Sequence, residues 1–258
     1  MSLSTIRFTC ATIATCSLVP ACVTAGETTA QSALSAASAE FSSCVESVYA
    51  ALVATANARP LVPAHYVLVG DGAPVTPLVV RTMNCGAITV AGENAGKGAI
   101  AQIGLLIVPP DGTGDVNLYQ LWYDTNVQEV AHAFRDGGLP ARYVQSLDER
   151  YTPCTTGACT FDVTVPAPAD PAFSVDGTVT PGSTATGAFT ANWWQDTSAG
   201  TLLLQSNAPQ VYQGTSDLTV ETSPQSQLGV LLGAGEAGPD VLRQFNQLDV
   251  DDVALVAK

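Results

Sequence analysis

The sequence predicts a mainly β protein with a minor helical part (α+β), in which an antiparallel sheet is closed or strongly curved into a barrel. About ten short segments rich in Val, Ile and Leu are separated by Gly, Pro and Asp, a pattern typical of strands joined by turns. Few segments have apolar residues at helical spacing, so only a few short helices are expected. No repeat with a period of roughly 20 to 50 residues is present, which disfavours a solenoid or a propeller.

A tether and a helix are expected before the first strand. Residues 22–41 are rich in Ala, Ser and Thr, so we predict a flexible tether there and a single β-rich domain over residues 42–258. Arg59-Pro60 is expected to end the helix, because the residue before a proline avoids helical geometry. The helix itself is predicted from apolar side chains at i, i+3, i+4, i+7 and i+8, namely Val45, Val48, Tyr49, Leu52 and Val53.

The middle of the chain alternates predicted strands with one more helix. Thr125 is the expected cap of that helix, residues 126–135, and Gln128 completes a capping box. Its apolar stripe is formed by Val127, Val130, Ala131 and Phe134. Strands are predicted over residues 66–69, 78–83, 87–90, 100–108, 116–123 and 142–147.

The second half repeats this texture of short apolar runs and turn residues. Short helices are expected over residues 227–232 and 241–245, and Pro239 would open the second. Strands are predicted over residues 160–165, 173–179, 189–194, 202–205, 218–221 and 251–256.

The N-terminus has the residue order of a secretory signal, predicted over residues 1–21. Arg7 is followed by an apolar run that is shorter than the roughly 20 residues of a membrane-spanning helix. Val19-Pro20-Ala21-Cys22 resembles the lipobox of bacterial lipoproteins, in which the cysteine is lipidated. Cleavage after Val23-Thr24-Ala25 is the alternative. The mature protein is therefore expected to be exported, either held at the cell envelope by a lipid on Cys22 or secreted.

Cysteine usage agrees with export. Of the seven cysteines, four remain for pairing after either cleavage: Cys44, Cys85, Cys154 and Cys159. An even set in an exported chain indicates disulfides. Cys154 and Cys159 bracket a turn-like Thr-Thr-Gly-Ala insert, so we predict that they pair, which leaves Cys44 with Cys85. Their spacing does not suit a zinc site, and no metal ion is expected.

Composition excludes several classes of protein. Only 12% of the residues are charged, and nine basic residues stand against 23 acidic ones, for a net charge of −14. This balance disfavours nucleic acid and anionic membrane surfaces as partners, so the only membrane contact expected is the N-terminal lipid. The glycine-rich segment at Lys97 lacks the spacing of a P-loop, and no Gly-x-Ser-x-Gly nucleophile motif is present. No cofactor is predicted.

Few side chains are candidates for acid–base chemistry. His132 lies off the apolar stripe of its predicted helix, so we interpret it as solvated, whereas His65 could pair with a carboxylate. The adjacent acids Asp148-Glu149 and Asp251-Asp252 point to opposite faces of a strand and cannot share a site. We therefore interpret both pairs as contributing to solvation.

One block of the sequence has a recognisable order of segments. It consists of Val79-Val80-Arg81-Thr82, Ile103-Gly104, Pro110-Asp111-Gly112, Leu118-Tyr119-Gln120-Leu121-Trp122-Tyr123 and Gly138-Leu139-Pro140-Ala141. This order resembles the acetoacetate decarboxylase-like superfamily, whose members have a curved, closed β-structure around a small apolar pocket. The resemblance implies a barrel but carries over no catalytic residue. Acetoacetate decarboxylase uses a lysine next to a second cation, whereas Lys97 and Lys258 are the only lysines here and are not paired.

The candidate ligand-binding residues are polar or aromatic side chains in apolar strands: Arg81, Gln102, Gln120 and Trp122. Strand alternation places Gln120 and Trp122 on one face. Arg81 has two alternative interpretations: it holds the polar end of a ligand, or it pairs with a structural acid, which we favour. Trp193 and Trp194 must also split between faces, with one inside and one at the surface or at a pocket mouth.

These observations favour an exported, non-enzymatic protein of the cell envelope that binds a small apolar or weakly acidic molecule. An enzyme on the same barrel, with a lysine-independent lyase, isomerase or hydrolase mechanism, is the alternative, and a structural or interaction module is the third class. A pocket that gathers Arg81, His65 and a carboxylate would favour the enzyme. A pocket lined by apolar and aromatic groups would favour binding.

Overall fold

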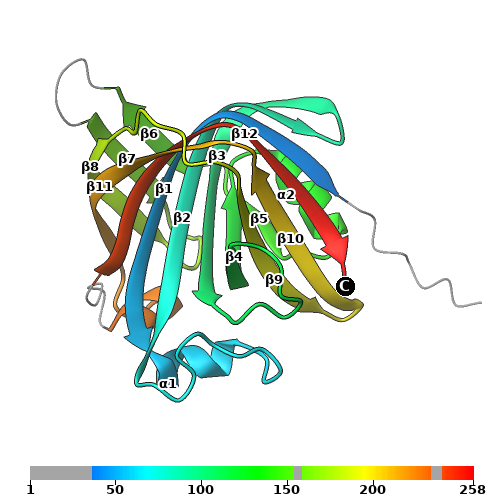
Figure 1. Ribbon diagram of the computed structural model, residues 1–258, viewed down its shortest axis with the longest axis vertical. Helices are drawn as coiled ribbons and strands as arrows, with labels where there is room; N and C mark the ends of the chain where they lie inside the picture. Colours follow the sequence, from blue (N-terminus) through cyan, green and yellow to red (C-terminus); the bar gives the residue numbers. More distant parts are fainter. Residues whose placement is uncertain (1–36, 154–158, 234–239) are drawn as a thin grey trace, which may run out of the picture. The chain divides into compact units, whose positions relative to one another are not determined.

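The computed structural model describes residues 37–153, 159–233 and 240–258, and seven of its strands close into a barrel (Figure 1). The barrel closes because the last strand pairs with the first, and every junction is antiparallel except β4–β9, which is parallel. The predicted mainly β barrel is confirmed. Its strands, in spatial order, are β1 (Ser38–Ala54), β2 (Val75–Val90), β3 (Glu93–Leu106), β4 (Val116–Thr125), β9 (Phe189–Thr197), β10 (Gly200–Ala208) and β12 (Asp240–Ala257).

A second group of strands leaves the barrel at β12 and forms an outer sheet. The first half of β12 pairs with β1 on one side and with β11 on the other, whereas its last residues pair with β10. The outer sheet consists of β11 (Val211–Thr222), β8 (Phe173–Thr180), β7 (Cys159–Val165) and β6 (Asp148–Thr152). A short strand, β5 (Ala141–Tyr143), pairs in parallel with β4.

The helices are short: α1 (Thr55–Ala58), a 3-10 turn η1 (Arg59–Leu61), α2 (Gln128–Asp136) and α3 (Gln227–Leu232). In the part of the chain that the structure describes, no helix has the length and apolar character needed to cross a membrane. The predicted stripe of α2 is confirmed, since Val130, Ala131 and Phe134 are buried. Thr125 does not cap α2, which begins three residues later, and its Oγ1 instead accepts a hydrogen bond from the Val127 N–H at 3.1 Å.

Two apolar cores lie on the two sides of the barrel wall. One lies inside the barrel and includes Met83, Leu118 and Trp193. The other lies against the outer sheet and includes Tyr49 and Val80 from the wall, together with the inward side chains of β7, β8 and β11. The wall strands are therefore buried on both faces.

Two predicted helices are strands. The segment with apolar residues at helical spacing, Val45 to Val53, lies in β1, and residues 241–245 lie in β12. A strand buried on both faces has a nearly continuous apolar sequence, so its residues match helical spacing as well as strand alternation. Apolar residues at helical spacing therefore do not distinguish a helix from a strand that is buried on both faces.

Several boundaries also differ from expectation. The first strand begins at Ser38, and Phe41 is buried, so the expected tether is too long at its C-terminal end. Residues 66–69 contribute only an isolated bridge between Leu68 and Ile107. The predicted strand over 142–147 is limited to β5, and β6 was not predicted.

One of the two expected disulfides is confirmed. Cys44 and Cys85 are bonded and stand directly opposite each other on β1 and β2, with their Cα atoms 4.0 Å apart. The other expected bridge involves Cys154, which lies outside the described residues, as do the expected signal peptide and Cys22.

Candidate functional site

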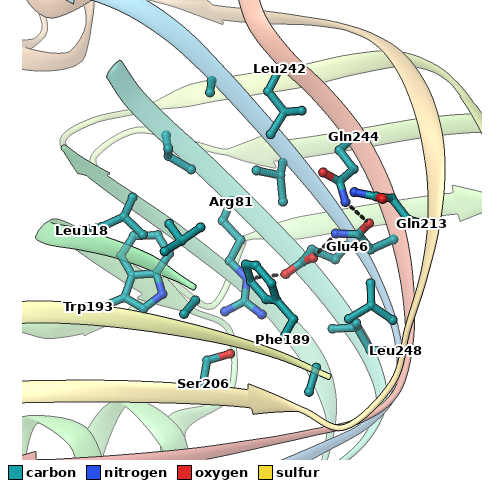
Figure 2. A pocket seen from close by; sticks show the side chains of 18 of the residues that line it. Glu46, Arg81, Leu118, Phe189, Trp193, Ser206, Gln213, Leu242, Gln244 and Leu248 are labelled. Atoms are coloured by element: carbon teal, nitrogen blue, oxygen red, sulfur yellow. Dashed lines mark hydrogen bonds and ion pairs between the residues drawn. The ribbon is translucent and has the colours of Figure 1, made fainter. Parts of the chain in front are cut away.

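A cavity of about 370 Å³ lies inside the barrel (Figure 2). Two residues that border the cavity, Phe189 and Leu242, are 40% and 44% exposed, so they mark the mouth of the cavity. A volume of this size is within the range of about 300–1,000 Å³ that is typical of small-molecule sites. Its deep wall is largely apolar and includes Val48, Ala50, Val79, Leu118, Ala191, Trp193 and Leu248.

The indole of Trp193 is a major part of this wall, and a glycine makes room for it. Gly104 of β3 faces Trp193, and a Cβ atom at this position would lie 3.0 Å from the Trp193 ring and 2.8 Å from the Tyr119 carbonyl oxygen. The absence of a side chain at Gly104 therefore allows the ring to pack against the backbone of β3. Trp193 itself is fully buried.

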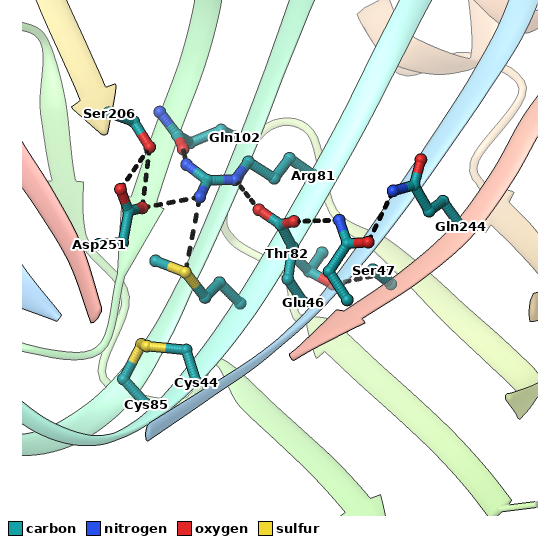
Figure 3. A network of polar contacts seen from close by, with 12 residues as sticks. Cys44, Glu46, Ser47, Arg81, Thr82, Cys85, Gln102, Ser206, Gln244 and Asp251 are labelled. Atoms are coloured by element: carbon teal, nitrogen blue, oxygen red, sulfur yellow. Dashed lines mark hydrogen bonds and ion pairs between the residues drawn. A yellow bond between two sulfur atoms is a disulfide. The ribbon is translucent and has the colours of Figure 1, made fainter. Parts of the chain in front are cut away.

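Arg81 of β2 is the charged residue at the inner end of the cavity, and it is held by partners from three other strands (Figure 3). Its Nε donates to Glu46 Oε1 of β1, and its Nη2 donates to Asp251 Oδ2 of β12 at 2.9 Å. Its Nη1 donates to Gln102 Oε1 of β3 at 2.9 Å. The favoured interpretation of Arg81, a structural ion pair, is the arrangement observed.

The two carboxylates of this cluster decide the charge state of Arg81. Burial opposes the charged guanidinium, but the charges of Glu46 and Asp251 and their hydrogen bonds outweigh it, so the pKa of Arg81 is raised above its ordinary value. Arg81 is therefore a permanent cation and cannot act as an amine nucleophile. Burial also raises the pKa of Tyr123, which lies near this cluster, so its phenol stays neutral.

Further polar side chains extend the cluster in two directions. Toward the mouth, Asn246 donates to Glu46 Oε2 at 2.6 Å, and Gln244 donates to Asn246 Oδ1 at 2.6 Å (Figure 3). On the other side, Ser206 donates to Asp251 Oδ1 at 2.8 Å. The polar groups thus satisfy one another along one wall, while the rest of the cavity lining stays apolar.

The four predicted ligand-binding residues do not all lie around the cavity. Arg81 borders the cavity, and Gln102 lies beside it at the closed end. Gln120 is buried, where its Oε1 accepts from Gln102 at 3.3 Å and its Nε2 donates to the Trp122 carbonyl oxygen. Trp122 is on the outer face of the wall and packs against the other core.

The face assignment for β4 was wrong because the strand contains a bulge. Ile103 pairs with Trp122 and the next residue of β3 pairs with Gln120, so Leu121 is an extra residue between them. An extra residue reverses the faces that follow it. Gln120 and Tyr123 therefore point inward, whereas Trp122 points outward.

The two adjacent tryptophans do lie on opposite faces, as predicted. Trp193 lines the cavity, but Trp194 is buried in the outer core rather than lying at the surface. The indole N–H of Trp194 donates to Asn117 Oδ1 at 2.8 Å. In contrast, the indole nitrogen of Trp193 has no hydrogen-bond partner among the described residues.

The lysines and histidines lie away from the cavity lining. Lys97 is exposed on β3, and Lys258 pairs with Asp111 at 2.9 Å. His132 is exposed on α2, as predicted. His65 is largely exposed, and its Nε2 is 3.4 Å from Asp196 Oδ2. These residues do not converge with Arg81.

Two residues of the site were not predicted from the sequence, and one prediction about them was wrong. Glu46 and Asp251 are buried partners of Arg81, so Asp251 does not serve solvation, although its neighbour Asp252 is exposed on the opposite face as expected. Glu149 of the pair Asp148-Glu149 is also buried. A lone acid within an apolar strand was the available signal, but its partner comes from a strand far away in the sequence.

No grouping of three or more His, Cys, Asp or Glu side chains in residues 37–153, 159–233 and 240–258 is arranged to hold a metal ion. The polar side chains of the cavity lining are one carboxylate, a guanidinium, three amides and two hydroxyls, together with the indole of Trp193, and they suit hydrogen bonding to an organic molecule.

Comparison with known structures shows that the fold is similar to that of acetoacetate decarboxylase, so the barrel that the resemblance implied is confirmed. A solved acetoacetate decarboxylase aligns with a TM-score of 0.57 at 7% identity, over 85% of this chain and 88% of that one. An acetoacetate decarboxylase-like enzyme from Sphingomonas wittichii RW1 aligns with a TM-score of 0.55 at 10% identity, over 87% and 92%. No family model matches the sequence, and neither does any curated protein.

Proposed function

We propose that this is an exported protein, secreted or lipid-anchored at the cell envelope, that binds a small and largely apolar molecule inside its barrel without transforming it. The observation that carries the proposal is the cavity of about 370 Å³, whose lining is mostly apolar and whose charged groups are paired with one another. Such a lining stabilises a bound apolar body by removing it from water.

The absence of a lysine from the cavity supports binding over decarboxylation. A Schiff-base mechanism needs an amine at the site, and Lys97 and Lys258, the two lysines of the chain, are not part of the lining. Incubation with acetoacetate followed by borohydride is therefore expected to leave both lysines unmodified, as mass spectrometry of the peptides would show. An adduct at Lys97 would contradict this part of the proposal.

A lysine-independent enzyme is the second candidate, because Glu46 borders the cavity and the similar structures are enzymes. However, both carboxylate oxygens of Glu46 already accept hydrogen bonds, one from Arg81 and one from Asn246. Protonation of Glu46 by a substrate would weaken its ion pair with Arg81, which disfavours Glu46 as a general base. Recovery of a chemically unchanged ligand after prolonged incubation would distinguish binding from catalysis.

The test of binding is a set of thermal melts with neutral and acidic apolar molecules. A ligand that binds only the folded state stabilises it by about 2.7 kcal/mol at roughly 100 times its Kd. Ala50→Phe, which places a ring in the cavity, should abolish this response, whereas Ala56→Phe at an exposed position of α1 should retain it. If no molecule stabilises the wild type, or if both variants respond equally, binding inside the barrel is excluded.

Export has a separate test. Peptide mapping of the protein from its native host, without reduction, is expected to show loss of residues 1–21 and bridges Cys44–Cys85 and Cys154–Cys159. A chain that retains its N-terminus and has free thiols at these four positions would contradict export.

A further inference from the structure

The indole N–H of Trp193 is a buried polar group of the cavity wall that lacks a hydrogen-bond partner among the described residues. Its nitrogen is shielded from solvent and has no hydrogen-bond acceptor among the described residues. Figure 2 shows this nitrogen on the side of the ring that faces Arg81. Buried tryptophan N–H groups usually find an acceptor, as Trp194 does with Asn117. An acceptor on a ligand would satisfy this donor once the ring and its neighbours shift enough to let the acceptor approach.

The charge next to Trp193 restricts what that acceptor can be. With Glu46 and Asp251 ionised, the cluster around Arg81 carries one net negative charge. An anionic headgroup placed here would be repelled by the excess carboxylate, and the lining offers no second cation to balance it. A cationic headgroup cannot be that acceptor, because an ammonium or guanidinium group only donates hydrogen bonds.

We propose that the ligand of the barrel is neutral and carries a hydrogen-bond acceptor, such as the carbonyl oxygen of an ester or a ketone, which accepts from Trp193 Nε1. This inference rests on the proposed binding function and names its ligand class. The apolar body of the ligand packs against Val79 and Leu118, and Arg81 serves the wall rather than the ligand. An ionised acid is consequently a poor ligand, in contrast to the expectation from the sequence.

The experiment compares four probes of similar length by calorimetric titration: methyl octanoate, nonane, octanoate and octylammonium. The wild type should bind the ester about tenfold or more tightly than each of the other three, since one hydrogen bond to a desolvated donor corresponds to about that factor. Trp193→Phe should reduce ester affinity to that of nonane and leave the affinity for nonane unchanged. Trp122→Phe, a matched change on the outer face, should retain the preference for the ester.

The outcomes separate the two proposals. If octanoate, octylammonium or nonane binds the wild type as tightly as the ester, or if Trp193→Phe keeps the preference, the ligand class is wrong while the binding function stands. If no probe and no member of the wider apolar set binds, the binding function itself fails. The wild-type series decides the ligand class by itself if Trp193→Phe does not fold.

Discussion

The two faces of the wall formed by β1 and β2 bury ionisable groups in different ways. On the inner face, Arg81 is charged and has partners on several strands. On the outer side, Glu149 of β6 is buried with both carboxyl oxygens unpartnered among the described residues. Its cross-strand neighbour Val163 belongs to the outer core, so Glu149 faces that core too.

The difference shows that burial alone does not decide whether a group keeps its charge. Desolvation raises the pKa of Glu149 well above its ordinary value, and the negative charge of Glu46 adds to the rise. Without a cation or a donor to offset desolvation, Glu149 is expected to be a neutral acid in the folded protein. Arg81 is buried as deeply, but its carboxylate partners outweigh desolvation.

The largest effect is expected from removing the cation of the inner face. Arg81→Met leaves Glu46 and Asp251 buried without their partner, and breaking such a network costs about 3–5 kcal/mol. Urea denaturation should show this loss. Gln102→Met, which removes only a neutral partner, should cost about 1–2 kcal/mol. A loss below 1 kcal/mol for Arg81→Met, as expected if it only bound ligand, would show that the cluster does not hold the wall together.

The next effect concerns the covalent link between the wall strands. Cys44 and Cys85 are separated by 41 positions, so replacing both by Ala releases a long loop in the unfolded state. The chain-entropy model predicts a loss of about 4 kcal/mol, and engineered cases often give less. Guanidinium denaturation of the double variant and of the reduced wild type should agree. Unchanged stability in both would mean that the disulfide does not constrain the unfolded chain.

Glu149→Gln is expected to stabilise the protein at neutral pH by about 1–2 kcal/mol, because it replaces a group whose ionisation opposes folding. The sign follows from the raised pKa of Glu149. Above its ordinary pKa of 4.5 the unfolded chain releases this proton while the folded chain retains it, so stability falls as the pH rises toward the folded pKa.

Denaturation at several pH values should show that Glu149→Gln removes the fall in the free energy of unfolding that this carboxyl group causes as the pH rises. Asp148→Asn, at a half-exposed neighbour, is the matched control and should keep it. If the wild type and Glu149→Gln have the same pH profile, then Glu149 is ionised in the folded protein.

The smallest effect is expected at the surface. Lys258 pairs with Asp111, and its Nζ lies 5.7 Å from the centre of the Trp194 ring. Hydrogen bonds from Thr113, and then from Lys258, lower the pKa of Asp111 to about 2. Lys258→Met should therefore raise this pKa only in part, as an NMR titration would measure, and should change stability by less than about 1 kcal/mol. A return of Asp111 to its ordinary pKa would show that Thr113 contributes nothing.

The sequence predicted β7 and β8 of the outer sheet more accurately than β1 of the barrel wall, although it missed β6. β7 alternates buried and exposed side chains along its whole length, because only one face packs on the core. The predicted strand at 160–165 matches it within one residue. In β1 both faces are covered, and strict alternation is lost. Local pattern therefore failed where tertiary packing covered the second face.

The candidate site was predictable only in part for a related reason. Arg81 could be selected because a charge in an apolar strand needs a partner or a cavity. Its partners Glu46 and Asp251 could not, because strand pairing between the two ends of the chain brings them together. The outward position of Trp122 depends on a one-residue bulge that leaves no clear mark in the sequence.

The most direct test of the central claim, that the inner face of the wall encloses a binding site, is a crystal structure with methyl octanoate brominated at its terminal carbon. The anomalous signal of the bromine marks the position of the ligand in an anomalous difference map. We predict bromine density inside the barrel and the ester carbonyl within hydrogen-bond distance of Trp193 Nε1. A barrel filled by ordered water, with bromine only on the outer surface, would contradict the account.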